Sequence, residues 1–542
     1  MSCTEQDGLL KAETAAFFAA EYPLLQLFPY DNDILVYDAK AHFAFILSAA
    51  ELVILVDYLI GKPDDDIFQA HSRDANEQAL LSLLTKFRDL QQAGLFLKGS
   101  AAQIAPVDRT AIQELLRYYD ENILLRKFCL QVTEDCNFRC TYCRRTITGS
   151  HSKYNLSEEH AYQGIQYYFH KYTAFYDKLP AAKKELLLQI VPPTLSYYGG
   201  EPFLQFDLIE KTAAYFKSLP WQQHDIPVTA LQFVSNTNLS IMNDRILRFL
   251  TDNKVTLFAS LDGPEEEHDK CRVFADGKGT FKTAYTNLIK IKEFDPVYFQ
   301  EKVSLFGVYT ADHDFAKCDD FINQQGALLC NHFPAEYGGI FVTNLPEKRE
   351  FYQTAFNTNL ATYKAMVTKL KDQDLDAVSD AFANIFLFAK LKVDHPAGIN
   401  SLNLLLSCPM GFDNLMLAAN GDYLICHKVG GQMPIGHCAT GLDSEKLITL
   451  YQQYNEVINN SDCTRCWNVQ FCDVCAASRM DQGHFINPSV AECDVLRMQT
   501  AYAFACFIHL SLQYPALLEN IFSFRNDPQK FLGVVDLNEF SQ

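Results

Sequence analysis

Three cysteines are spaced for metal–sulfur chemistry in the segment LQVTEDCNFRCTYCRR. Cys136, Cys140 and Cys143 directly follow an apolar run that predicts a β-strand, and thiolates are the usual protein ligands of iron–sulfur clusters. Three ligands leave one iron of a four-iron cluster open to bind a cofactor or substrate. A structural zinc ion would need a fourth ligand nearby, and no Cys or His follows within the next several residues. The loop alone leaves a zinc site or unliganded thiols as the alternatives.

A second group of seven cysteines lies toward the carboxyl end of the chain. Its pattern is Cys408-x12-Gly421-x4-Cys426, Cys463-x2-Cys466-x5-Cys472-x2-Cys475 and Cys493. The chain has 17 cysteines in all, which would not persist as disulfides in a cytosolic protein. Clustered cysteines are therefore better explained as metal ligands, with two zinc ions as the alternative to iron–sulfur clusters.

The first cysteine loop, with the aromatic Tyr142 before its third cysteine, resembles the radical S-adenosylmethionine (SAM) superfamily. The resemblance implies that Cys136, Cys140 and Cys143 hold a catalytic [4Fe–4S] cluster. Further positions fit that family's motifs in the expected order and would contact the cofactor together with Tyr142: Gly199, Gly200, Glu201 and Pro202 in a glycine-rich motif, Ser235 and Asn236 at a polar strand end, and Ser260, Asp262 and Arg272. For each polar residue the alternative role is a strand cap or a surface ion pair.

The seven later cysteines resemble a SPASM domain, the auxiliary-cluster module of radical SAM enzymes that act on peptides. The resemblance implies two auxiliary iron–sulfur clusters of the [4Fe–4S] type. The outer one would be held by Cys463, Cys466, Cys472 and Cys493, and the inner one by Cys408, Cys426 and Cys475. Cys472 and Cys475 are separated by two residues where the family usually has three. The inner cluster lacks a fourth ligand, which leaves an open iron, fewer irons, or a ligand from elsewhere such as Cys330 or Cys438.

His427 follows Cys426 at the position where sulfatase-maturing relatives carry an aspartate base. We take it as a candidate catalytic residue. A histidine here counts against copying the sulfatase mechanism, and a substrate contact or a hydrogen bond to the inner cluster is the favoured role over that of a base.

The elements around these motifs indicate an α/β protein. From Lys127 to about Phe333, short apolar strands alternate with helical segments, which is the pattern of a parallel βα barrel or sheet. With the resemblance, we expect a partial (β/α)6 TIM barrel over residues 111–345. A helical bridge over 346–400 and a cysteine-rich SPASM domain with a closing helix over 401–542 would follow.

The first 110 residues predict a separate small domain. Residues 24–46 contain short strands separated by turn signals, Ser48 and Glu51 form a capping box before an apolar helix, and Asn76–Gln92 has helical spacing. A last strand is expected at LFLK, residues 95–98. The order β-β-α-α-β resembles a winged-helix domain, which in peptide-modifying enzymes recognises a leader peptide.

Composition limits the partners. Against 46 basic residues the chain has 66 acidic ones, a net charge of −20 that opposes nucleic acid and anionic membranes. The opening residues are acidic where a secretory signal would be basic, so we expect a cytoplasmic protein. Partners implied by the resemblance are a precursor peptide with its leader and an electron donor such as flavodoxin or ferredoxin.

Together these observations predict a radical SAM maturase that installs a thioether, carbon–carbon or carbon–oxygen crosslink, or a related change, in a ribosomally made peptide. Two other functions remain open. One is a maturase acting on a folded protein such as a sulfatase. The other is an iron–sulfur redox-sensing DNA-binding regulator, which the acidic charge disfavours.

Overall fold

The structure is a computed structural model of the 542-residue chain. It describes residues 12–30, 33–39, 43–72, 76–99, 107–143, 146, 152–310, 313–327, 329–334, 409–429, 431, 433–460, 462–468, 472, 476–481, 483–487, 490, 493 and 497. The expected helical bridge over 346–400 and the expected closing helix lie outside the described residues, as do Cys408 and Cys475.

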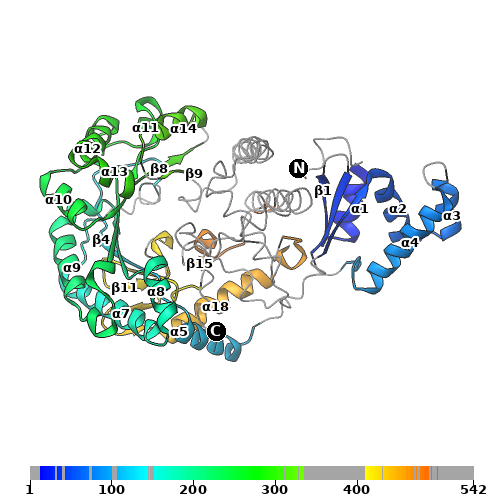
Figure 1. The fold of residues 1–542 in the computed structure, drawn as a ribbon, viewed down its shortest axis with the longest axis horizontal. Coiled ribbons are helices and arrows are strands. Elements are labelled where there is room, and N and C mark those ends of the chain that lie inside the picture. Colours follow the sequence, from blue (N-terminus) through cyan, green and yellow to red (C-terminus); the bar gives the residue numbers. More distant parts are fainter. Residues whose placement is uncertain are drawn as a thin grey trace.

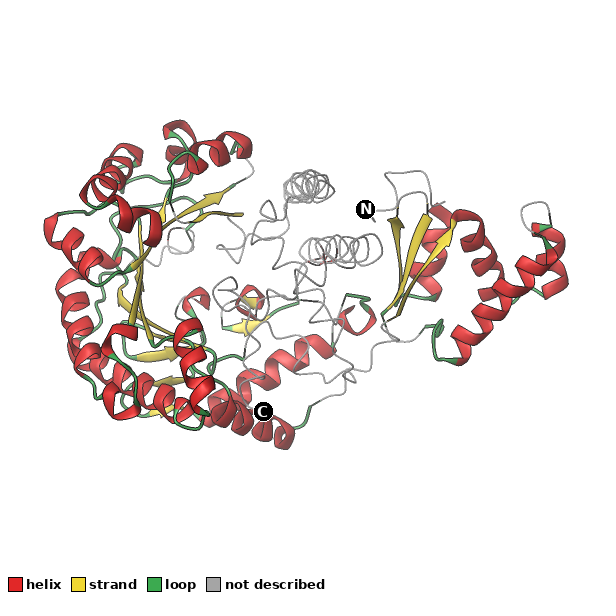
Figure 2. Cartoon of the chain, in the orientation of Figure 1, coloured by secondary structure: helices red, strands yellow, loops and turns green. Residues whose placement is uncertain are grey.

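Six parallel strands follow one another from the middle of the largest sheet to one of its edges (Figures 1 and 2). In chain order they are β4 (Lys127–Thr133), β5 (Thr194–Gly199), β6 (Gln232–Thr237), β7 (Thr256–Ser260), β8 (Val303–Tyr309) and β9 (Leu329–Pro334). Each strand pairs in parallel with the next, which confirms the expected α/β half barrel. In β4 every residue after Lys127 is buried, as expected for a strand covered on both faces.

Helices connect these strands and cover the outer face of the sheet (Figure 1). They are α7 (Glu158–Tyr176), α8 (Ala181–Ile190), η2 (Pro202–Gln205), α9 (Phe206–Ser218), η3 (Trp221–His224), η4 (Val228–Ala230), α10 (Asp244–Asp252), α11 (Glu265–Cys271), α12 (Phe281–Phe294), α13 (Pro296–Lys302) and α14 (Phe315–Asn323). Side-chain caps set their starts: Ser157 Oγ accepts the His160 N–H at α7, and Asn243 Oδ1 accepts the Ile246 N–H at α10. Within the described residues, no helix has the length and apolarity needed to span a membrane.

The carboxyl-terminal region extends the same sheet beyond β4. Strand β10 (Asn414–Leu417) pairs with β4 in parallel, and β11 (Asp422–Leu424), β12 (Gly436–His437) and β13 (Gly441–Leu442) follow in antiparallel order. At the junction, Asp413 pairs with Arg126 through its carboxylate, and its carbonyl accepts the Arg126 N–H at 3.0 Å. The barrel and the cysteine-rich region therefore share one ten-stranded sheet.

The rest of the carboxyl-terminal region packs beside this sheet. Helix α18 (Ser444–Asn459) contacts α5 (Arg109–Asn122), where Tyr119 and Tyr451 pack with ring centroids 6.3 Å apart. The remaining elements are short: η6 (His427–Val429), η7 (Asp462–Arg465), η8 (Ala476–Arg479), β14 (Met480–Asp481) and β15 (His484–Phe485). Short elements of this kind place cysteines in turns rather than on long regular surfaces.

The amino-terminal domain has a hydrophobic core of its own. Its elements are α1 (Ala12–Glu21), the antiparallel strands β1 (Leu25–Tyr30), β2 (Asp33–Asp38) and β3 (Phe43–Ser48), and the helices α2 (Ala49–Leu59), α3 (Asp64–His71) and α4 (Glu77–Gln92). The strands agree with the expected meander, and the capping box of Ser48 and Glu51 is confirmed.

The strand expected at residues 95–98 was wrong. The chain turns there, because Phe96 has a φ of 59°, outside the range of a strand. Its N–H bonds to the Asp38 carboxylate at 3.0 Å, and its buried ring packs on Phe45 and Phe87. The apolar pattern that suggested a strand instead closes the core of the domain.

Candidate active site

The first cysteine loop is fastened to the segment that follows α11. The Arg139 N–H bonds to the Val273 carbonyl at 2.7 Å, and the Thr141 N–H bonds to the Cys271 carbonyl at 2.9 Å. The rings of Phe138 and Phe274 meet edge to face, with centroids 5.1 Å apart. A short β-bridge between Phe138 and Phe274 adds to this. The loop thus has a fixed backbone, as a ligand loop for a cluster requires.

Two glycines at the end of β5 allow the next loop to lie against the cysteine loop. A Cβ atom at Gly200 would lie 2.0 Å from the Asp135 carbonyl oxygen and 2.9 Å from the Cys136 Cβ. A Cβ at Gly199 would lie 2.4 Å from the Thr133 carbonyl oxygen. The Gly200 N–H donates to that same carbonyl at 3.0 Å. No side chain fits at either position without moving the backbone that holds Cys136.

Glu201 joins the ends of β5 and β6. Its side chain is completely buried, and it accepts hydrogen bonds from Thr237 Oγ1 at 2.9 Å and from the Asn238 N–H at 2.7 Å. Burial raises the pKa of this carboxyl to about 7, against three hydrogen bonds that lower it. These contacts make Glu201 a residue that positions the loop after β6, while Pro202 begins the buried turn η2 beside it.

The loop after β6 brings an amide to the first cysteine. Asn238 Nδ2 donates to Asn137 Oδ1 at 3.0 Å and lies 3.7 Å from Cys136 Sγ. Ser240 Oγ also donates to Asn137 at 3.1 Å. Asn238 was missed as a site residue from the sequence, although the run Asn-Thr-Asn contains it. Hydrogen bonds to a ligand sulfur tune the reduction potential of a cluster. Asn238 is therefore a further site residue of the polar strand end, beside Ser235 and Asn236.

Tyr142, Asp262 and Arg272 form one buried group. Asp262 Oδ2 accepts the Tyr142 hydroxyl at 2.9 Å and Arg272 Nε at 2.8 Å, while Oδ1 accepts the Val308 N–H at 2.8 Å. The Arg272 guanidinium also lies 5.4 Å from the centroid of the Tyr142 ring. The structure therefore brings these three candidate residues together, between the cysteine loop, β7 and β8.

The remaining candidates lie at the carboxyl ends of β6 and β7. Ser235 is buried and its Oγ donates to the Asn236 carbonyl at 3.3 Å, which is a local strand-end bond. Asn236 and Ser260 are partly exposed and end or nearly end their strands. In a half barrel this edge is the one that builds the site.

Two thiols of the cysteine loop have raised pKa values, because they are buried. Burial raises the pKa of Cys136 to about 11 and that of Cys140 to about 12, although the Arg272 cation lowers the latter. Such thiols are protonated at neutral pH unless a metal binds them. Three thiolates in one loop fit a [4Fe–4S] cluster that keeps one iron open.

Comparison with known proteins identifies this part of the chain. Residues 130–309 match the family model described as the radical SAM superfamily. This part of the chain is a radical SAM domain. Its cofactors are S-adenosylmethionine and a [4Fe–4S] cluster, and the match runs from within β4 to the end of β8, so it covers the cysteine loop and every motif assigned above. A search of curated proteins found no match.

Solved structures that resemble this chain were also found. The structure of anSMEcpe with bound AdoMet has 15% sequence identity and a TM-score of 0.50, and the match covers 71% of this chain and 99% of that one. Streptococcus suis SuiB bound to its precursor peptide SuiA has 11% identity and a TM-score of 0.42, with coverage of 87% and 99%. At 15% identity, the likeness to anSMEcpe shows a shared fold alone.

In this radical SAM enzyme, His427 lies beside the glycine motif. Its ring packs on that of Tyr198, the residue before Gly199, with centroids 5.0 Å apart. Burial, together with the nearby cations Lys127 and Lys428, lowers the pKa of His427 to about 3. A neutral imidazole with so low a pKa is a weak base at neutral pH, which agrees with a contact or positioning role.

Three of the late cysteines, Cys463, Cys472 and Cys493, lie near the buried Arg479, and the fourth, Cys466, lies near Cys493. Arg479 Nη2 lies 3.9 Å from Cys463 Sγ. The charge of Cys472 also acts to raise the pKa of the Arg479 guanidinium. Cys493 lies close enough to Cys463, Cys466 and Arg479 for their charges to affect its pKa, which burial raises to about 12. These are the four residues expected to hold the outer auxiliary cluster. Arg479 itself was not singled out from the sequence.

The environment of Arg479 fits an anionic group. Its side chain is 1% exposed, yet Nε and Nη1 have no hydrogen-bond partner in the described part of the chain. A buried cation with unpaired donors is costly unless an anion accompanies it. A thiolate-ligated cluster between the four cysteines would supply that anion.

The inner cysteine set is only partly visible. Cys426 lies two residues after β11. Its Sγ accepts the Lys428 N–H at 3.4 Å, and its charge acts to raise the pKa of the Cys129 thiol in β4. Cys408 and Cys475 lie outside the described residues, and so does the side chain of Cys330. Cys438, the other candidate fourth ligand, lies instead with His160 and His437.

Proposed function

We propose that this radical SAM enzyme modifies a ribosomally made precursor peptide, installing a thioether, carbon–carbon or carbon–oxygen crosslink or a related change. The observation that carries the proposal is the amino-terminal domain, which has its own core and presents a sheet edge. When bound, the cluster and S-adenosylmethionine supply one-electron cleavage and hydrogen abstraction from an unactivated carbon. The protein's own residues bind and orient the groups involved.

Cofactor binding falls to the residues around the cysteine loop. Cys136, Cys140 and Cys143 would hold the cluster, and Gly199 and Gly200, which pack directly against the backbone of that loop, would belong to the cofactor site beside it. Arg272 carries a cation next to Cys140 and suits the cofactor carboxylate. Asn236 and Ser260, partly exposed at the strand ends, suit its ribose. His427, whose ring contacts that of Tyr198, would contact the peptide or the inner cluster.

Peptide recognition is assigned to the edge of β3. In the three-stranded sheet β2 lies in the middle, so β1 and β3 are the edges among the described strands. Pro29 in β1 has no N–H to donate to an added strand, whereas β3, FAFILS, has an N–H at every position. An extended leader peptide adding to β3 would gain main-chain hydrogen bonds along one edge.

Auxiliary clusters complete the proposal. The outer one would be held by Cys463, Cys466, Cys472 and Cys493 around Arg479, and the inner one by Cys408, Cys426 and Cys475. Either could accept the electron released when a crosslink forms. A cytoplasmic electron donor such as flavodoxin or ferredoxin would reduce the first cluster.

The test of peptide recognition uses precursors encoded beside the gene. Deleting residues 1–106 should raise the dissociation constant for the precursor strongly and leave S-adenosylmethionine cleavage without peptide intact. Proline placed in turn at residues 44, 45 and 46 sharpens the test, because N–H groups in a strand alternate between the neighbour β2 and the open edge. The outward position should lose precursor affinity while the domain stays folded. Equal affinity in every soluble, cluster-loaded variant would return the domain to a structural role.

Cluster assignment needs a separate experiment. Replacing Cys136, Cys140 and Cys143 by Ala should abolish 5′-deoxyadenosine formation while iron remains in the carboxyl-terminal region. Reconstituted enzyme should bind on the order of 12 irons if all three clusters are [4Fe–4S]. A preparation that holds zinc and only about four irons would remove the auxiliary clusters from the proposal.

A further inference from the structure

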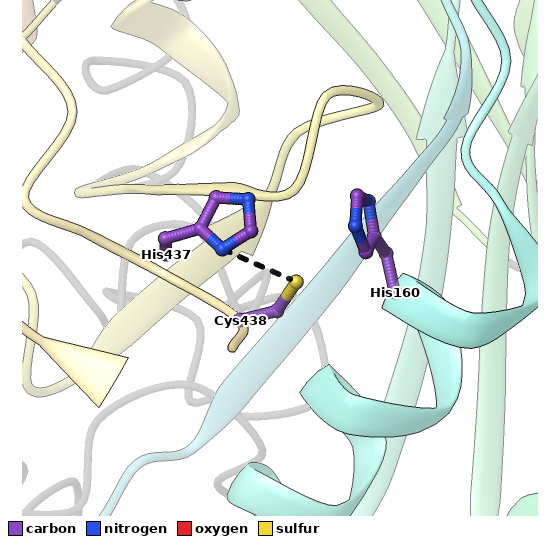
Figure 3. Close-up of side chains that lie close together, drawn as sticks. All are labelled: His160, His437 and Cys438. Atoms are coloured by element: carbon purple, nitrogen blue, oxygen red, sulfur yellow. Dashed lines mark hydrogen bonds between the residues drawn. The ribbon is translucent and has the colours of Figure 1, made fainter. Parts of the chain in front are cut away.

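Three potential metal ligands meet outside the sites described above (Figure 3). They are His160 in the first turn of α7, His437 at the end of β12, and Cys438, which follows it. One ligand atom from each residue lies within 4.8 Å of the others. The two rings meet edge to face, with centroids 5.3 Å apart. Their positions in the chain are far apart, so the fold brings them together.

The backbone at Gly421 lies close against both rings. A Cβ atom at Gly421 would lie 2.5 Å from His437 Nε2 and 2.9 Å from His160 Nδ1. A side chain at this position would therefore push the two rings away from their present places. Gly421 also has a φ of 93°, which favours glycine there independently.

The ligands themselves are suited to this role. The ring nitrogens of His160 have no hydrogen-bond partner in the part of the chain that the structure describes. Nδ1 of His437 accepts the Ala439 N–H at 3.2 Å and lies 3.9 Å from Cys438 Sγ. Because Nδ1 accepts that N–H, it carries the lone pair of the ring, which is the electron pair that a metal ligand needs. The buried Cys438 would bind as the thiolate.

Two carboxylates lie near the thiol. Asp422 and Glu159 both act on Cys438 electrostatically. One of them, or a water molecule, would take the fourth position and help neutralise a divalent ion. Two imidazoles and one thiolate in a tetrahedral set favour zinc over hard ions such as calcium or magnesium.

We propose that His160, His437 and Cys438 bind a zinc ion that clamps α7 of the barrel to β12 of the cysteine-rich region. Gly421 lies directly before β11, which leads to Cys426 and His427. The Cys438 N–H bonds to the Gly421 carbonyl at 2.9 Å, so the clamp also fixes the start of that strand. The ion has a structural role and holds the inner-cluster segment in register with the barrel.

The test measures zinc in full-length enzyme reconstituted with iron. Elemental analysis should find roughly one zinc per chain in the wild type, at least tenfold less in Cys438→Ser and His437→Ala, and an unchanged amount in His170→Ala. His170 is the matched control, an exposed histidine on the same helix α7. Iron content should not differ between Cys438→Ser and the wild type, which separates this site from the clusters.

X-ray absorption at the zinc edge gives a reading that needs no variant. Because the edge is element-specific, the iron clusters do not interfere. One sulfur at about 2.3 Å with nitrogen or oxygen ligands at about 2.0–2.1 Å is the expected shell. A sulfur-only shell, or zinc that Cys438→Ser leaves unchanged, would show zinc occupying a cluster site and overturn the proposal. Absence of zinc after growth and purification with added zinc would overturn it too.

Discussion

Arg272 Nε donates to Asp262 Oδ2 at 2.8 Å, and the two side chains are only 7% and 0% exposed. The same carboxylate binds the Tyr142 hydroxyl and the Val308 N–H. One aspartate thus links the cysteine loop, the segment after α11 and β8. The buried cation that faces Cys140 depends on this partner for its charge balance.

Asp262→Asn should therefore be strongly destabilising. It leaves Arg272 buried without a charged partner, a change that costs about 3–5 kcal/mol. Thermal unfolding under anaerobic conditions measures the effect. The matched control is Asp207→Asn, which breaks an exposed pair with Arg245 and should cost under about 1 kcal/mol. Similar losses in both variants would contradict the charge-balance argument.

Gly200→Ala should disturb the first cluster. Its Cβ would lie 2.0 Å from the Asp135 carbonyl oxygen, so the backbone that holds Cys136 must move. Overpacking of this kind costs about 1–3 kcal/mol. We expect loss of cluster iron and of S-adenosylmethionine cleavage. Gly61→Ala is the control: a Cβ there has open space, and although the φ of 83° strains an alanine locally, the change lies in the amino-terminal domain and should leave both unchanged. Full cleavage by Gly200→Ala would show that the loop accommodates a methyl group.

Arg479 should raise the reduction potential of the outer cluster, because a buried cation stabilises the more negative, reduced state. Arg479→Gln is expected to lower that potential on the order of 60–130 mV, which corresponds to losing one charge-assisted hydrogen bond. Electron paramagnetic resonance during a redox titration measures it. Arg479→Lys should restore part of the shift. Arg465→Gln is the control, since Arg465 is exposed although it lies two residues after Cys463; equal shifts would exclude a specific role.

Glu201 should make stability depend on pH. Its pKa is raised from 4.5 to about 7 by burial, so between these values the folded state binds more protons than the unfolded state. Stability should therefore fall as pH rises from 4.5 to 7, by up to about 1.4 kcal/mol per pH unit. Glu201→Gln should remove this slope. Melting temperatures of both proteins across that range provide the measurement, and parallel curves would count against the assignment.

Local sequence signals predicted the barrel well. Apolar runs bounded by turns marked the parallel strands, the capping box of Ser48 and Glu51 marked one helix start, and helical spacing marked the helix over Asn76–Gln92. LFLK at residues 95–98 failed because apolar residues also fill a turn that closes a core. Composition alone does not distinguish these two uses.

Contacts between distant segments were not predictable. The pairing of β10 with β4 joins residues nearly 290 positions apart, with Asn414 opposite Lys127. Likewise, no sequence motif links His160 to His437, although their side chains lie close together. Arg479 is not part of the cysteine pattern, although its side chain lies near Cys463. In each case the residue type is ordinary and only the fold gives it a role. Candidates carried by compact motifs, such as Tyr142, Asp262 and Arg272, were brought together as expected.

The pairing of β10 with β4 has a consequence for biosynthesis. Strand β4 is the first strand of the barrel to leave the ribosome, yet its outer edge gains a partner only when residues 414–417 have been made. Until then the nascent chain exposes an unpaired, apolar edge of the kind that promotes aggregation. Truncation after β9 should leave that edge open permanently. Expression of such fragments, however well their motifs are preserved, is therefore expected to require a chaperone or yield inclusion bodies.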